Sequence, residues 1–250
     1  MGRQDTSANN RQNTSHYAVD TQAFIFNPVL QRSPLFSRID KDIVRMMLPM
    51  MRREHWPKNH YLNTQHALNE RFYILLNGRI KIAQQHANNG KELTLFLLGP
   101  GDGFNVLCLI DEGGRNSQLT TLDEVDVLSA SIHHWKEWMD QYPVVRHAVE
   151  EYAAAQIQHL SDLAAELALE DTLTRLVHMI LRYTDTENHP QHCNLIKDLS
   201  QEELAHMIGT VRPVLARLIG QLKREKLIEV ERGEMRILNY QRLLEKINNE

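Results

Sequence analysis

The sequence predicts an α+β fold in which an amino-terminal jelly roll is joined by one long helix to a carboxy-terminal winged helix-turn-helix. Three features predict it: short apolar runs between turn residues up to residue 142, a heptad-like apolar seam after Pro143, and a helix start followed by a glycine turn and a basic helix after residue 199. Apolar residues make up 42% of the 250 residues, so the chain can bury a sizeable core.

Composition excludes several classes of protein. The 28 basic and 32 acidic side chains give a net charge of −4, so any nucleic-acid site must be local. Two cysteines, Cys108 and Cys193, are too few for a disulfide framework or for the four thiolates of an ordinary iron-sulfur cluster, and they favour a reducing cytoplasm. No apolar run approaches the roughly 18 residues that a membrane-spanning helix needs.

The expected domains follow the changes in composition along the chain. Residues 1–22 are rich in Asn, Gln, Ser and Thr, and we expect a disordered tail because too few apolar side chains offset the entropy of ordering. Residues 23–142 then form the β-roll, residues 143–170 the dimerisation helix, and residues 171–250 the winged helix-turn-helix.

The β-roll is expected to begin with a short helical segment around Ile39 to Met51. Asn77-Gly78 suits the positive backbone angles of a tight turn, so it predicts a hairpin between residues 71–76 and residues 79–82. Further reversals are expected at residues 88–91 and 99–103.

After Pro143 an apolar seam recurs at alternating spacings of four and three residues. This spacing predicts a coiled-coil seam and a symmetric dimer. Its members are Val149, Ala153, Gln156, Leu160, Leu163 and Leu167, and Ile157 and Ala164 widen the stripe. The alternative is an amphipathic helix that packs on its own domain.

A helix-turn-helix is predicted after residue 199. Ser200 and Glu203 form a capping box at the start of a short helix, Gly209 permits a sharp turn, and Thr210 is expected to cap the second helix. Pro213 falls in the first turn, where a missing amide is harmless.

The second helix has two predicted faces. Val211, Leu215, Leu218, Ile219 and Leu222 are expected to face inward, and Arg212, Pro213, Ala216 and Arg217 to lie on or near the outer side. Five basic residues against one acidic residue lie between Arg212 and Lys226, and residues 227–238 then predict the hairpin of a wing. The alternative is a helical subdomain with a solvated basic face.

At this point the chain resembles the CRP/FNR superfamily of bacterial transcription regulators. Three motifs in order carry the resemblance: residues 73–80 resemble the family's strand, glycine turn and strand, residues 99–102 its turn before the effector-binding segment, and residues 199–217 its DNA-binding motif. The resemblance implies a homodimer with a cyclic-nucleotide-binding-like sensory β-roll and a winged helix that binds a palindromic operator. It further implies that Ser200, Thr210, Arg212, Pro213 and Arg217 contact double-stranded DNA, and that an activator would contact RNA polymerase.

The chain departs from the family members that bind cyclic AMP. Where they carry Gly-Glu, it reads Asn105-Val106, and where they carry Arg-Ser, it reads Asn116-Ser117, with Arg115 displaced by one position. Valine cannot accept a ribose hydrogen bond, so we predict that cyclic AMP is not the effector. On the long helix, Leu160 followed by Ser161 replaces the threonine that cyclic AMP binders place there. The regulator is therefore expected to respond to an unidentified small effector or to follow its own abundance.

Two alternatives to an effector-controlled DNA-binding regulator are open. The family contains haem-dependent gas sensors, and with 13 histidines in the chain, of which His55, His60, His66 and His86 lie in the sensory region, a haem-dependent gas or redox sensor is one alternative. A second is an effector-binding module that has lost DNA binding, which the outward Arg212 and Arg217 argue against. No His-x-His metal motif, Gly-x-Ser-x-Gly elbow or phosphate-binding Gly-Lys loop occurs, so neither a metal site nor an enzyme is expected.

Overall fold

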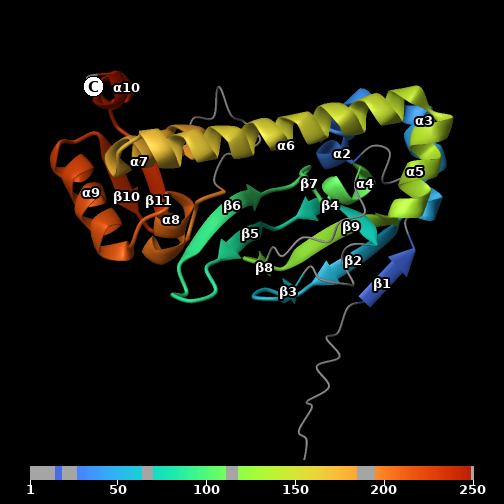
Figure 1. Ribbon diagram of the computed structural model, residues 1–250, viewed down its shortest axis with the longest axis horizontal. Helices are drawn as coiled ribbons and strands as arrows, with labels where there is room; N and C mark the ends of the chain where they lie inside the picture. Colours follow the sequence, from blue (N-terminus) through green and yellow to red (C-terminus); the bar gives the residue numbers. More distant parts are fainter. Residues whose placement is uncertain (1–14, 19–26, 64–69, 111–117, 185–194, 249–250) are drawn as a thin grey trace, which may run out of the picture.

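The computed structural model describes residues 15–18, 27–63, 70–110, 118–184 and 195–248 (Figure 1). A β-roll occupies the centre, a long helix runs along one side of it, and the carboxy-terminal helices cluster at the far end of that helix. Within the described ranges, no helix is both long and apolar enough to cross a membrane.

The β-roll is built from two antiparallel sheets. The first has the order β1-β2-β9-β4-β7 and the second the order β3-β8-β5-β6. The strands are β1 (Ser15–Ala18), β2 (Arg52–Trp56), β3 (Tyr61–Asn63), β4 (Arg71–Asn77), β5 (Ile80–Gln85), β6 (Glu92–Leu98), β7 (Gly103–Phe104), β8 (Gln118–Thr121) and β9 (Val125–Ser131).

Short helices cover the outer face of the first sheet. They are α2 (Pro28–Arg32), the 3-10 helix η1 (Phe36–Arg38), α3 (Lys41–Met47), the 3-10 helix η2 (Leu48–Met50), α4 (Leu107–Ile110) and α5 (Ile132–Gln141). The helical segment predicted around Ile39 to Met51 is thus confirmed as α3 and η2.

One part of the expected tail is a strand instead. Residues Ser15–Ala18 form β1, which pairs antiparallel with β2 in the register Ser15 to His55. Composition missed this because edge pairing uses main-chain donors and acceptors, which any sequence supplies. The other residues of the expected tail lie outside the described ranges.

The predicted hairpin at Asn77-Gly78 is wrong. The turn exists, with Gly78 at φ 83°, but it carries the chain from β4 in the first sheet to β5 in the second. A Cβ on Gly78 would lie 2.5 Å from the Glu124 carbonyl oxygen, so the turn packs against the segment before β9. Turn chemistry sets the reversal but not the partner of the next strand.

The carboxy-terminal part continues from the long helix. Its elements are α6 (Pro143–Leu169), α7 (Thr172–Thr184), α8 (Gln201–Met207), α9 (Arg212–Arg224), β10 (Ile228–Glu231), β11 (Glu234–Ile237) and α10 (Tyr240–Asn248). Asp171 caps α7, because its Oδ1 accepts from the Thr174 amide at 2.7 Å.

Three apolar clusters hold these layers together. One lies between the first sheet and the helices and centres on Phe72 and Trp135, whose rings meet edge to face at 5.0 Å. A second fills the roll between the two sheets, and a third joins α7, α8 and α9 and includes Leu97 and Leu122 of the β-roll. The third cluster therefore attaches the carboxy-terminal part to the β-roll.

Candidate nucleic-acid interface

The interface begins at α8, whose first turn is closed by the predicted capping box. Ser200 Oγ accepts from the Glu203 amide at 3.2 Å, and the Ser200 amide donates to Glu203 Oε2 at 2.7 Å. Leu204 and Ala205 are buried and form the inner face of α8. The box fixes where α8 starts and therefore where the turn after it falls.

The turn between α8 and α9 is made by Gly209. Its φ is 64°, and a Cβ there would lie 2.5 Å from Leu167 Cδ2 on α6, so glycine suits both the backbone and the contact. The expected cap at Thr210 is wrong. Val211 is the N-cap residue and makes no side-chain cap bond, while the Thr210 amide donates to the Ala205 carbonyl at 2.9 Å.

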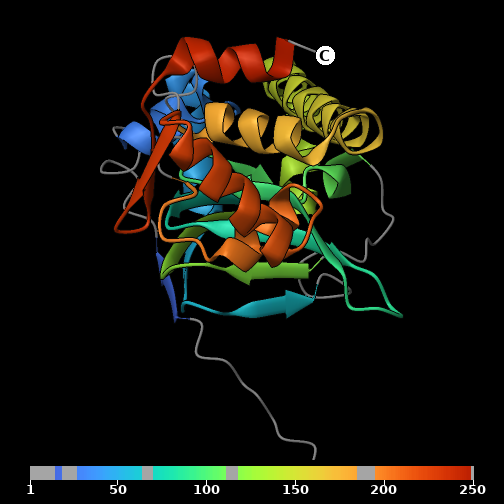
Figure 2. The same cartoon turned by 90° about the vertical axis from the view of Figure 1, so that its left-hand side faces the viewer.

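Helix α9 presents the predicted outer face. Leu215, Leu218, Ile219 and Leu222 are buried, whereas Arg212, Pro213 and Arg217 are exposed and Ala216 is half-buried. Val211, expected to face inward, is 53% exposed because it precedes the first helical turn. In the view turned by 90°, α9 faces outward at the end of the molecule (Figure 2).

Positive charge continues past the end of α9. Lys223, Arg224 and Lys226 are exposed, while Glu225 is engaged by Lys246 of α10 at 2.8 Å. That ion pair lowers the pKa of Glu225, since it stabilises the carboxylate. The exposed side chains between Lys223 and Lys226 are therefore all cationic, as phosphate contact requires.

Strands β10 and β11 form the predicted wing. They pair antiparallel with Ile228 opposite Ile237, and their turn holds Gly233 at φ 78°. The Asp198 amide donates to the Gly233 carbonyl at 2.9 Å, so the wing is tied to the segment just before α8.

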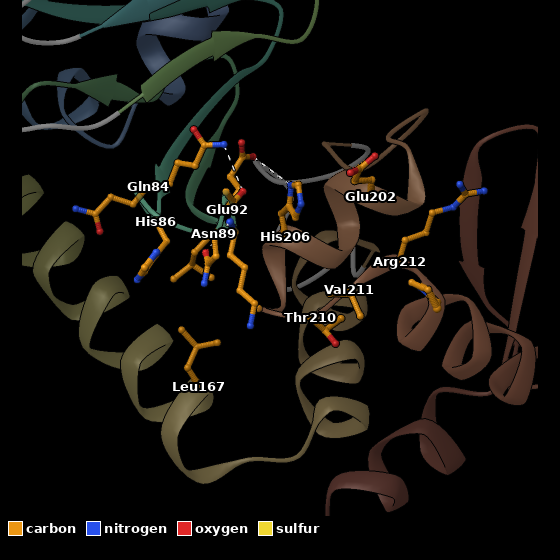
Figure 3. Close-up of a pocket in the computed structure, with 16 residues that line it drawn as sticks. Gln84, His86, Asn89, Glu92, Leu167, Glu202, His206, Thr210, Val211 and Arg212 are labelled. Atoms are coloured by element: carbon orange, nitrogen blue, oxygen red, sulfur yellow. Dashed lines mark hydrogen bonds and ion pairs between the residues drawn. The ribbon is translucent and has the colours of Figure 1, made fainter.

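A groove of about 1090 Å³ separates the start of α9 from the β5–β6 hairpin (Figure 3). His206 of α8 faces Glu92 of β6 across it, with Nδ1 3.2 Å from Oε1, and Leu167 of α6 lies below. Arg212 extends away from the hairpin, and so it is free to meet a partner beyond the groove.

Of the residues expected around an effector, the four that the structure describes do not converge. Val106 is 6% exposed and packs in the cluster between the first sheet and the helices, while the Asn105 amide group donates to the Arg71 carbonyl at 3.4 Å. Leu160 is half-buried and Ser161 exposed on α6. Arg115, Asn116 and Ser117 lie outside the described residues.

The space between the two sheets holds aromatic rings that sequence reasoning did not single out. Tyr73 and Phe104 stack at 4.9 Å, and Trp56 lies 5.4 Å from Tyr73 and 6.0 Å from Phe104. All three are buried. Only strand alternation could have pointed to them, because it puts Tyr73 and Trp56 on inward positions.

The seam predicted on α6 faces its own chain over much of its length. Val149, Ala153 and Leu163 are 0%, 3% and 7% exposed without any partner copy, and Val149 and Ala153 belong to the cluster around Trp135. Gln156 and Leu167 are half-buried, like Leu160, and Gln156 donates to the Tyr152 hydroxyl at 3.1 Å. Val149, Ala153 and Leu163 are therefore covered by their own chain, because heptad spacing alone does not say whose surface a seam covers. For Gln156, Leu160 and Leu167 the dimer interface stays a prediction.

Tyr152 connects α6 to Gly103, and Asp102 closes the turn before β7. The Tyr152 hydroxyl accepts from the Gly103 amide at 2.7 Å and donates to the Gly103 carbonyl at 2.8 Å. Asp102 Oδ2 accepts from the Gly99 amide at 2.9 Å, and burial raises the pKa of Asp102 to about 6. Burial likewise raises the pKa of Tyr152, so the phenol stays neutral.

The histidines do not assemble a metal centre in the part of the chain that the structure describes. No three His, Cys, Asp or Glu side chains gather there into a group that could hold a metal ion. His60 is 4% exposed, and burial lowers its pKa. His134 stacks on Trp138 at 6.0 Å at the start of α5.

Comparison with known proteins agrees with this geometry. The cyclic nucleotide-binding domain family matches residues 53–142, and the Crp-like helix-turn-helix domain family matches residues 174–246. The chain is 23% identical over 217 residues to the CRP-like cAMP-activated global transcriptional regulator of Mycobacterium tuberculosis, covering 86% of this chain and 96% of that protein. It is 25% identical over 209 residues to the cyclic AMP receptor protein of Thermus thermophilus, covering 83% and 94%.

A solved structure shares the fold. A CooA mutant from Carboxydothermus hydrogenoformans superposes with a TM-score of 0.65 at 19% identity, covering 79% of this chain and 88% of that one.

A β-roll, a long helix and a winged helix-turn-helix with exposed arginines define a DNA-binding transcription regulator. The relatives reported above are regulators of transcription and not enzymes. The chain belongs to the CRP/FNR family.

Proposed function

We propose that this regulator binds a two-fold symmetric operator as a homodimer, with one α9 helix in the major groove of each half-site. The observation that carries the proposal is the outer face of α9, on which Arg212 and Arg217 are exposed; the helix itself lies at the end of the molecule (Figure 2). Arginine can donate two hydrogen bonds to guanine O6 and N7, with about 1 to 3 kcal/mol of discrimination for a good pair. Pro213 offers no side-chain donor or acceptor, so the base beside it is read by contact alone.

We place the dimer interface on the face of α6 that the β-roll leaves open. Ala154, Ile157, Ser161, Ala164 and Ala168 are exposed there at spacings of three and four residues. Ile157 is a large apolar side chain left 58% exposed. Small residues at the other positions allow two such helices to approach closely, as a two-fold interface requires.

We propose that Ser200, at the start of α8, and Thr210, in the turn before α9, contact phosphates and read no base. The Ser200 hydroxyl already accepts from the Glu203 amide, but its proton remains available to a phosphate oxygen. Thr210 is half-buried beside the start of α9. Both would position α9 on the duplex without selecting a base.

For the effector, we propose that cyclic AMP does not control this chain, although both relatives named above carry it in their names. Val106 is buried outside the roll and cannot accept a ribose hydrogen bond. Another small molecule, or protein abundance, then sets activity, and haem is the alternative cofactor. Titration calorimetry with cyclic AMP and cyclic GMP tests this, and micromolar cyclic AMP binding that raises operator affinity would contradict it.

A regulator of this kind works beside the transcription machinery. We therefore propose a cytoplasmic location, contact with RNA polymerase if the protein activates, and no enzymatic activity. The support is the regulatory role of the relatives.

Selection of bound duplexes from random DNA tests the operator proposal. The unmodified protein is expected to enrich an inverted repeat, and Arg217→Ala to lose preference at one guanine of each half-site. Arg32→Ala, which removes an exposed charge on α2, is the matched control and should leave the motif unchanged. An unsymmetrical motif, or a motif that Arg217→Ala leaves intact, would overturn the proposal.

A further inference from the structure

Arg79, at the start of β5, connects the β-roll to the segment that enters α8. Its Nε lies 2.7 Å from Asp123 Oδ2 and its Nη2 2.9 Å from Asp123 Oδ1, a two-pronged pair within the β-roll. Its Nη1 donates to the carbonyls of Leu195, at 2.8 Å, and Lys197. The side chain is 16% exposed.

This guanidinium therefore joins two parts of the chain with four hydrogen bonds. Asp123 binds Nε and Nη2 and so fixes the plane of the guanidinium, and Nη1 then points at the backbone before α8. Hydrogen bonding from Arg79, together with its charge, lowers the pKa of Asp123, so that carboxyl remains an acceptor. A guanidinium is planar and always charged, and it loses little conformational entropy for each hydrogen bond it forms. Arg79 can therefore fix the relative orientation of the two segments as well as hold them together.

Apolar packing presses the same two segments together. Leu195 and Ile196 are buried in the cluster that includes Leu97 and Leu122 of the β-roll. A Cβ on Gly99 would lie 2.6 Å from Leu195 Cδ2, so only glycine permits the approach without a shift. A further polar contact between the carboxy-terminal part and the β-roll is single: His206 Nδ1 of α8 lies 3.2 Å from Glu92 Oε1 of β6.

The segment that Arg79 holds leads directly to both DNA-facing elements. One residue past Lys197, the Asp198 amide donates to the Gly233 carbonyl of the wing at 2.9 Å. Two residues further, Ser200 closes the capping box of α8. A shift of residues 195–197 against Arg79 would therefore move α7, α8, α9 and the wing together relative to the β-roll and α6, because one apolar cluster joins these helices.

We propose that Arg79 is a positioning residue for DNA binding, which sets the angle of α9 to α6 and thereby the half-site spacing that the dimer accepts. This inference rests on the proposed dimer and operator. In a two-fold dimer the two α9 helices are related through α6, so an error in this angle is doubled between half-sites. In this proposal Arg79 contacts no base and does not affect which half-site sequence is preferred.

Operators of altered spacing separate this role from general stability. One extra base pair turns a half-site by about 35° and moves it about 3.4 Å. We expect the unmodified protein to bind operators with one pair inserted or removed about tenfold more weakly or worse, which is about 1.4 kcal/mol. For Arg79→Gln we expect weaker binding to the selected operator. Changing the spacing of that operator by one base pair should then reduce the affinity of this variant less than threefold.

The readout is a ratio within one protein sample, which a change in folded fraction does not move. Arg53→Gln is the matched control, since Arg53 of β2 pairs with Asp126 of β9 at 3.2 Å, a contact within the β-roll. Its spacing ratio should equal that of the unmodified protein. Arg79→Lys should fall between, because an ammonium cannot reach Asp123 and two carbonyls in one plane.

If Arg79→Gln does not fold, Asp123→Asn carries the same test, because an amide cannot accept both of the hydrogen bonds that hold the Arg79 guanidinium in place. Loss of the spacing ratio in either variant supports the inference. An unchanged ratio in a folded variant, or an unmodified protein indifferent to spacing, would overturn it while leaving the operator proposal standing. Failure of the operator proposal shows earlier, as the absence of any symmetric motif in the selection.

Discussion

The exposed face of α6 offers a direct test of the dimer through Ile157→Asp. Full burial of an isoleucine side chain contributes about 1.5 to 3 kcal/mol, and 58% of Ile157 is exposed in the single chain. Contact with a partner can therefore contribute about 1 to 2 kcal/mol for each copy, or about 2 to 4 for the pair. Two unpaired carboxylates at the interface add at least about 1 to 3 kcal/mol each.

The expected loss is therefore at least about 4 kcal/mol, which weakens dimerisation about a thousandfold. The fold of the single chain should survive, because Ile157 faces away from the apolar clusters and Ile and Asp have similar helix propensities. Sedimentation velocity over a range of protein concentrations measures the dissociation constant directly.

Ala155→Asp is the matched control for this experiment. Ala155 is exposed on the same helix but lies outside the open seam, so the same carboxylate there should leave the dimer intact. A dimer that tolerates Ile157→Asp, or one that Ala155→Asp disrupts equally, would refute the placement of the interface.

Three further variants test the fold at fixed protein concentration by urea unfolding. The folded pKa of Asp102 is raised from 3.8 to about 6, so protonation of this carboxyl makes the unmodified protein more stable as the pH falls from 6 to 4. Asp102→Asn should therefore be more stable than the unmodified protein above pH 6, by up to about 3 kcal/mol, and should lose that advantage by pH 4. A stability difference independent of pH would contradict the raised pKa. Ser200→Ala should lower the free energy of unfolding by about 1 kcal/mol through loss of the capping box, and no change would show that the box does not stabilise α8. Gly209→Ala should cost about 1 to 2 kcal/mol because its φ is 64°, and an unchanged midpoint would show that the turn relaxes around the methyl.

Local patterns predicted the carboxy-terminal half well. The capping box at Ser200, the glycine turn at Gly209 and the buried stripe from Leu215 to Leu222 are confirmed, because each depends on neighbours within a few residues. Thr210 failed as a cap for a local reason too. Its amide bonds back to Ala205, which delays the helix by one residue.

Long-range pairing was beyond the same reasoning. Nothing near Asn77-Gly78 says that β5 joins the other sheet, and nothing within α6 says that Val149 and Ala153 meet Trp135 of their own chain. Arg79 was visible only as a strand residue, since its partners Leu195 and Lys197 are more than a hundred positions away.

Hydroxyl-radical footprinting on the selected operator tests the central claim most directly. A dimer that places one α9 in each half-site should protect two backbone patches of equal strength, related by two-fold symmetry and centred about 10 to 11 base pairs apart or a multiple of that on one face of the duplex. A single unsymmetrical patch, or protection that does not depend on the sequence of the duplex, would contradict the account.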